Sequence, residues 1–120
     1  MLRKRNKQKP RLPTLEEMLQ FRPARGEFPW ELTEEGLVRI TVPKFESSFG
    51  KSFCQFIRKG DTFTANLDKI GSAVWKHCDG RRTVKEILAI LKKEFPKEQN
   101  IDQRLFLFLQ QMGQLNYLYY

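Results

Sequence analysis

Cysteine and histidine are scarce in this chain of 120 residues, which contains two cysteines and one histidine. Cys54 and Cys78 lie in unlike local settings, and the sequence holds no CxxC pair. Zinc and iron–sulfur sites use clusters of such ligands at short spacings. The sequence therefore predicts no metal site and no cofactor, and Cys78 is interpreted as a small core residue.

Long apolar runs are also missing. No run reaches the roughly 18 residues that a membrane-spanning helix requires, and no secretory h-region is present. The two cysteines show no spacing typical of a disulfide framework. We therefore expect a soluble, cytoplasmic protein with no membrane span.

The common catalytic motifs are absent from the sequence. It contains no GxSxG, no glycine-rich phosphate loop, no HExxH and no DxDxDG loop. His77, the single histidine, is more typical of a packed or surface residue than of a catalytic base. Asp79 and Glu86 each have a simpler role at a helix terminus. The sequence therefore predicts a protein that is not an enzyme and has no catalytic residues.

Basic charge is present, but it is concentrated at the N-terminus. The net charge is +8, and the first twelve positions contain no acidic residue and six basic ones: Arg3, Lys4, Arg5, Lys7, Lys9 and Arg11. The rest of the chain is close to neutral. Such a run is typical of a solvated arm, and contact with nucleic acid or with an acidic partner stays open for it.

A short helix is predicted at the end of this arm. Thr14 and Glu17 fit a T-x-x-E capping box, and Leu15, Met18 and Leu19 give the following turns one apolar side. A helix this short needs tertiary contacts, so we expect it to dock on the domain. Residues 1–27 are therefore interpreted as a basic arm with a short helix, and residues 28–120 as one folded domain.

Three strands are predicted, from Phe28 to Leu32, from Leu37 to Val42 and from Thr62 to Leu67. The turn Thr33–Gly36 joins the first two into a hairpin. In the second strand, Val38, Ile40 and Val42 occupy alternate positions, which predicts one buried face. Pro29 lacks a backbone donor and fits an edge strand.

A phenylalanine-rich segment separates the second and third strands. Its apolar residues recur mostly at spacings of three and four: Phe45, Phe49, Phe53, Phe56 and Ile57. This spacing predicts an amphipathic helical turn from Ser48 to Arg58. Two roles stay open for it, a satellite of the core or an exposed aromatic face for a partner or a membrane.

Two short helices that meet at a tight corner are predicted after the third strand. Asp68 is a good N-cap, and Asp79-Gly80 ends the first helix. Thr83 and Glu86 then form a second T-x-x-E box. Trp75 and the corner itself are interpreted as architecture, because packing and backbone geometry account for them.

A third helix is predicted from Asn100 to Gly113. The unbroken run from Leu105 to Leu109 makes it apolar on more than one side. The chain then ends with Tyr117, Tyr119 and Tyr120. A terminal segment packed on the sheet is favoured for these residues over a final strand.

The two-helix corner also carries a resemblance. The residues Leu67-Asp68, Gly71, Val74-Trp75, Cys78-Asp79-Gly80, Arg82-Thr83-Val84 and Glu86-Ile87 resemble the signature of the PqqD family, named for pyrroloquinoline quinone biosynthesis protein D. The resemblance runs from Phe28 to the C-terminus and is densest between residues 62 and 91. It implies an α+β, winged-helix-like domain in which a three-stranded antiparallel sheet is followed by three helices.

The same resemblance implies a function as a RiPP recognition element. Such a domain binds the leader of a ribosomally made precursor peptide and presents it to a modifying enzyme, often a radical SAM protein. The leader would add as a strand along the third predicted strand, interpreted as a sheet edge, and press on the third helix. The peptide-binding residues implied in this way are Thr62, Phe63, Thr64, Ala65, Asn66, Leu67, Leu105, Phe108 and Leu109, with Arg104 facing acidic leader residues. A purely structural role stays equally open for the apolar ones.

Two other functions stay open. A helical corner with a basic arm is also found in winged-helix DNA-binding proteins, although Arg104 is the only basic residue of the third helix. The fold could also serve an interaction or scaffold protein, including a homodimer formed through the phenylalanine-rich segment or the tyrosine-rich end.

Overall fold

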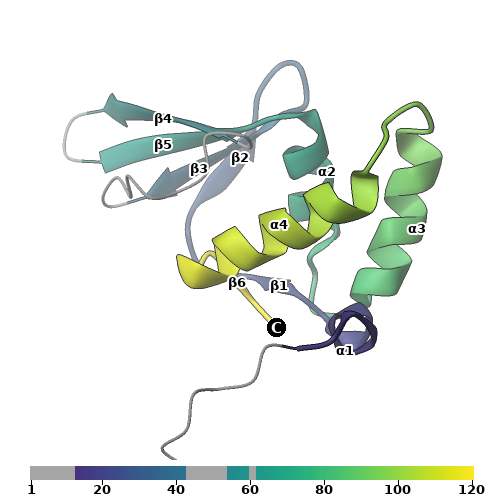
Figure 1. The fold of residues 1–120 in the computed structure, drawn as a ribbon. Coiled ribbons are helices and arrows are strands. Elements are labelled where there is room, and N and C mark those ends of the chain that lie inside the picture. The colour runs from purple at the N-terminus through teal and green to yellow at the C-terminus, as the bar shows by residue number, and fades with distance from the viewer. Residues whose placement is uncertain (1–12, 43–53, 60–61) are drawn as a thin grey trace, which may run out of the picture.

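The computed structural model describes residues 13–42, 54–59 and 62–120, with the backbone alone for residues 54–59. Its elements are α1 (Leu15–Gln20), β1 (Ala24–Arg25), β2 (Trp30–Leu32), β3 (Val38–Val42), β4 (Cys54–Lys59), β5 (Thr62–Leu67), α2 (Lys69–His77), α3 (Val84–Glu94), α4 (Ile101–Gln114) and β6 (Leu118–Tyr119). Figure 1 shows an antiparallel sheet beside the three C-terminal helices. The predicted α+β class is confirmed.

The main sheet has four strands in the order β2-β3-β5-β4, and every neighbouring pair is antiparallel. All three predicted strands are present in it. The predicted alternation in β3 is confirmed, because Val38, Ile40 and Val42 are buried while the residues between them are half-buried. Gly36 closes the β2–β3 turn with a φ of +83°, a conformation that glycine adopts without strain.

The fourth strand corrects the prediction for the phenylalanine-rich segment. Residues 54–59 form β4 instead of the helical turn predicted up to Arg58. Six residue pairs along β5 hold β4 in the sheet, so pairing between strands overrides a local helical spacing. Phe45, Phe49 and Phe53 lie outside the described residues, as does the basic arm up to position 12.

The corner between α2 and α3 forms as its capping residues predict. The Asp68 side chain accepts a hydrogen bond from the backbone N–H of Gly71 at 2.7 Å, which caps α2. Thr83 and Glu86 form the complete capping box of α3. Gly80 lies between the helices with a φ of +80°. The starts of both helices are therefore capped by their own side chains, and the corner is fixed locally.

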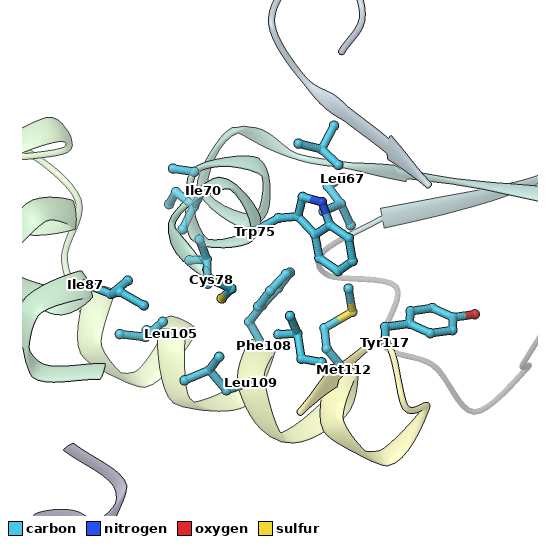
Figure 2. Packing of buried hydrophobic residues seen from close by; sticks show 14 of the residues in the cluster. Leu67, Ile70, Trp75, Cys78, Ile87, Leu105, Phe108, Leu109, Met112 and Tyr117 are labelled. Atoms are coloured by element: carbon cyan, nitrogen blue, oxygen red, sulfur yellow. The ribbon is translucent and has the colours of Figure 1, made fainter. Parts of the chain in front are cut away.

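The core lies between α2, α3, α4 and one face of the sheet. Figure 2 shows Trp75 of α2 near Phe108 and Met112 of α4. Trp75 has no exposed surface, and its indole Nε1 has no hydrogen-bond partner. Leu67 brings the end of β5 into the same cluster. The large indole therefore fills the space where sheet and helices meet.

The N-terminal segment docks on this core, as predicted. α1 packs against α3, and the backbone N–H of Val84 donates to the carbonyl of Phe21 at 2.9 Å. β1 pairs with β6, so the tyrosine-rich end forms a short final strand, and the favoured prediction of a terminal segment packed on the sheet was wrong. The rings of Phe21 and Tyr120 stack at 5.3 Å. Residues 21–25 therefore contact the C-terminal residues 118–120 directly.

We expect Trp75→Ala to unfold the domain, because deleting a fully buried indole costs about 3–5 kcal/mol. Thermal and urea unfolding followed by circular dichroism will measure the loss. Trp75→Phe removes the unpartnered N–H but keeps an aromatic ring, so its loss should be smaller. A cooperatively folded Trp75→Ala protein with unchanged stability would contradict this view of the core.

The two capping boxes give a matched pair of variants. Thr83→Ala should destabilise the domain by about 1 kcal/mol, because α3 packs its apolar side into the core. Thr14→Ala removes the same bonds from α1, which has no buried residue, and should leave global stability nearly unchanged. Urea unfolding of both variants checks this, and equal losses would show that α1 folds as one unit with the core.

Candidate functional site

The strand predicted to bind a peptide lies inside the sheet. β5 pairs with β3 on one side and with β4 on the other. A strand with two neighbours already has its backbone N–H and C=O groups bonded, so it cannot accept a third strand. The prediction of a free edge along Thr62–Leu67 was therefore wrong. Its cause is β4, which forms from a segment whose spacing predicted a helix.

The apolar residues predicted for the groove belong mostly to the core. Those with an exposed fraction of 2% or less are Ala65, Leu67, Leu105, Phe108 and Leu109. Phe63 is partly buried against the same cluster. Figure 2 shows the three α4 residues within the packed interior. They would have to leave the core before they could touch a peptide.

The polar residues predicted for the groove divide between surface and interior. Thr62 is exposed at the start of β5, whereas Thr64 is buried. Asn66 is half-buried and accepts a hydrogen bond from Nε of Arg39 at 3.2 Å. These contacts hold the outer face of the sheet together.

Arg104 is engaged with the domain's own carboxylates. Its Nη2 lies 3.1 Å from Oδ2 of Asp68, and its Nη1 lies 3.5 Å from Oε1 of Glu98. Asp68 is also the N-cap of α2, so this ion pair joins the starts of two helices. Arg104 was predicted to face acidic residues of the leader. In the structure its guanidinium pairs with carboxylates of the domain itself.

The open edges of the sheet are β2 and β4. Within the described part of the chain, neither strand has a second neighbour. Along β2, the carbonyl of Pro29 accepts from Thr41 and the N–H of Thr33 donates to Leu37, so both residues face β3. Backbone direction alternates along an antiparallel pair. The N–H and C=O groups of Trp30 and Leu32 therefore point away from the sheet.

The same alternation applies to β4. Thr41 bonds toward β2, so the backbone groups of Ile40 bond toward Ala65, its partner in β5. Thr64 must then bond toward Ile57 of β4. It follows that the backbone groups of Phe56 point outward, and no strand among residues 13–42 and 62–120 pairs with that side of β4.

Two residues of β2 carry large apolar side chains that are exposed to solvent. Trp30 is 37% exposed and Leu32 is 52% exposed. They lie across from Ile40 and Val38, so they share the face of the sheet that the core covers. The Trp30 ring meets the buried Trp75 ring edge-on, with centroids 6.2 Å apart. The exposed Trp30 side chain thus packs against a buried residue of the core.

Arg25 also contacts Trp30. Its guanidinium carbon lies 5.3 Å from the centroid of the Trp30 ring. Its Nη1 donates to the carbonyls of Trp75 and Lys76 at the end of α2, both at 3.0 Å. A cation over an indole attracts its π face, and a cation at a helix C-terminus is also favourable. Arg25 therefore fixes the orientation of Trp30 at the edge.

The surroundings of this edge differ at its two ends. Before β2 lies a hollow lined by Arg25, Gly26, Glu27, Phe28 and Tyr119. After β2, a second hollow is lined by Glu31, Leu32, Thr33, Glu34, Glu35 and Arg39. Arg39 pairs with Glu31 at 3.3 Å. The hairpin end of the edge is therefore acidic.

Sequence reasoning placed β2 at an edge but did not single out Trp30, Leu32 or Arg25. The available signal was the Trp30-x-Leu32 spacing directly after Pro29, which puts two large apolar residues on one face of an edge strand. Arg25 carried no such signal, because its contacts with Trp75 and Lys76 are distant in sequence.

The described residues contain no cluster of three or more metal-ligating side chains. Nε2 of His77 lies 3.9 Å from a Glu94 carboxylate oxygen, on the helical surface. Backbone N–H groups of Arg82 and Arg81 lower the pKa of Asp79, as expected for a carboxylate that closes a turn. In the same part of the chain, no helix is long and apolar enough to cross a membrane.

Cys78 is a core residue, as predicted. It is fully buried and free of a disulfide. Burial raises the pKa of its thiol to about 12, against the opposing influence of the Arg25 charge. A group whose pKa rises on folding stabilises the fold while it stays protonated. This contribution is complete below a pH of about 9 and is lost as the pH rises toward 12.

We expect the Cys78 thiol to resist alkylation in the folded protein. In a Cys54→Ser variant, iodoacetamide at about pH 8 should leave Cys78 unmodified, because the reactive form is the thiolate. Mass spectrometry measures the product, and full alkylation in denaturant is the control. Rapid alkylation under native conditions would show a reactive thiol.

Comparison with known protein families gave a match to the C-terminal half of this chain. The family model described as coenzyme PQQ synthesis protein D (PqqD) matches residues 58–118, just over half of the chain. The match begins later than Phe28, where the resemblance in the sequence starts, and it includes the dense segment 62–91. Comparisons with curated proteins and with solved structures gave no match. The matched segment runs from the end of β4 through all three C-terminal helices to the start of β6, and the chain belongs to the PqqD family.

Proposed function

We propose that this protein binds the leader of a ribosomally made precursor peptide by strand addition and presents it to a modifying enzyme, with a radical SAM enzyme as the expected partner. Its family is one of accessory proteins in coenzyme PQQ synthesis. An accessory role is consistent with a function as a binding protein and not as an enzyme. The partners in this proposal are the precursor peptide and the modifying enzyme.

The observation that supports strand addition is the open edge of the main sheet. Trp30 and Leu32 direct backbone donors and acceptors away from β3, and no described strand takes them up. An extended peptide satisfies such groups by forming the next strand. The peptide would add at an outer strand of the sheet, because β5 has neighbours on both sides.

Presentation follows from the position of the edge strands. A peptide added to an outer strand is held along a few residues, and the rest of its chain stays outside the domain. The modifying enzyme can then act on that free part while the leader remains bound. Binding therefore raises the local concentration of the reacting segment near the enzyme.

The structure gives less support to DNA binding. A recognition helix directs basic or amide side chains at base edges. The only basic residue of α4 is Arg104, and it is bonded to Asp68 and Glu98. The single basic side chain of α4, the helix that a DNA-binding protein would use, is therefore already paired with acidic side chains of the domain.

A display library of short random peptides tests the proposed function, and it requires no assumption about the sequence of the precursor. We expect the purified full chain to enrich peptides that bind in the micromolar range. Amide NMR spectra should then show shifts at β2 or β4, and slower hydrogen exchange there, because new backbone hydrogen bonds form. The amides of β5 serve as the internal control, since they are already bonded.

Two results would reject the proposal. One is the absence of any enriched binder, and the other is a set of binders whose shifts avoid both edges of the sheet. Tight binding of random duplex DNA with a steep salt dependence would favour the DNA-binding alternative. A dimer in light scattering whose interface covers β2 and β4 would favour the scaffold alternative.

A further inference from the structure

We propose that the open edge of β2 selects an extended peptide segment in which a basic residue precedes two large apolar residues separated by one position. The inference rests on the proposed function and specifies the edge and the class of peptide. It is carried by three observations, namely the β2 backbone groups that no described strand takes up, the two exposed side chains beside them and the acidic hollow at the hairpin end.

The backbone of β2 determines the form of the ligand. Trp30 and Leu32 each present one N–H and one C=O on the open side. Both donors and acceptors are matched by an extended chain, whereas a helix has no backbone groups free along its side. Every strand pair among the described residues is antiparallel. The bound segment is accordingly an antiparallel strand.

The exposed side chains determine the spacing of its apolar residues. Trp30 and Leu32 lie on one face of β2, two positions apart. Residues directly opposite each other in a strand pair share a face and contact each other. Two apolar ligand residues separated by one position would therefore cover Trp30 and Leu32 together, while the residue between them faces the other side.

Trp30 has the features of an anchor for such a segment. The Trp75 ring packs against the Trp30 ring in an edge-to-face arrangement, and the Arg25 guanidinium of β1 lies over the Trp30 ring. Little side-chain entropy is then lost when a ligand packs on the indole. Fixed aromatic residues beside arginine are typical of the positions that contribute most to binding.

The acidic charge at the hairpin end of β2 determines where the ligand carries its basic residue. The hollow beyond Leu32 is lined by Glu31, Glu34 and Glu35, and its one basic lining residue, Arg39, is paired with Glu31. No ion pair within the described residues engages Glu34 or Glu35. An antiparallel ligand passes this hollow before it reaches Leu32 and Trp30. A lysine or arginine ahead of its apolar pair would therefore face these two carboxylates.

Two isomeric octapeptides test the inference on the full chain. The first, KKSVTLTS with blocked termini, has alternate apolar residues after two lysines. The second, KKSVLTTS, has the same composition with the apolar residues adjacent, so they fall on opposite faces of a strand. We expect the first to shift the amides of Trp30 and Leu32 and to bind about tenfold more tightly than the second.

Leu32→Lys and Leu107→Lys form a matched pair of variants. Both replace an exposed leucine, 52% exposed in β2 and 43% exposed in α4. We expect Leu32→Lys to weaken binding of the first peptide at least tenfold, because it removes the apolar contact and places a cation near a basic ligand. Leu107→Lys should leave binding unchanged. Circular dichroism confirms that both variants are folded.

The outcomes separate this inference from the function on which it rests. Equal binding of the two octapeptides, or shifts confined to β4, would overturn the inference while library binders at β4 would still support peptide binding. Failure of both the octapeptides and the library would reject the two together. Shifts at β2 that grow with protein concentration in the absence of peptide would identify a second copy of this chain as the occupant and overturn the inference.

Discussion

The burial of Trp75 is the contact on which the rest of this structure depends. Its indole has no exposed surface and lies where α2, α4 and the sheet meet. Its ring also touches Trp30 at the edge of the sheet, and its backbone carbonyl binds Arg25. One residue thus joins the core, the edge strand and the N-terminal segment. A change in core packing would reach the open edge directly, because the rings of Trp75 and Trp30 are in contact.

This connection explains how an exposed edge can stay ordered. β2 has three residues and a single described strand neighbour, which alone gives little stability. Trp30 adds contacts with Trp75 and Arg25, and Arg25 is itself fixed to the end of α2. These contacts hold Trp30 in place at the edge. A binding surface ordered in advance loses less entropy when an extended chain pairs with it.

Much of the fold could be predicted from sequence because its signals are local. Asp68, Thr83 and Glu86 define helix starts within four residues, and the alternation of β3 defines its buried face. The position of β5 could not be obtained in this way. It depends on β4, a strand whose phenylalanine spacing indicates a helix and whose pairing is decided by contacts along β5. The candidate site lies at β2 and not at β5 for the same reason, because strand order decides which strands form the edges of a sheet.

The candidate edge and the family signature occupy different parts of the chain. Arg25, Trp30 and Leu32 precede residue 58, where the match to the PqqD family begins. The matched segment builds the corner and the helices, and these elements bury Trp75. Leu32 is half-exposed and Trp30 packs against Trp75, so a change at Leu32 should cost less stability than a change at Trp30. Selectivity for a peptide would then be adjusted at Leu32 and in the acidic hairpin beside it, while Trp30 remains the fixed point of the edge.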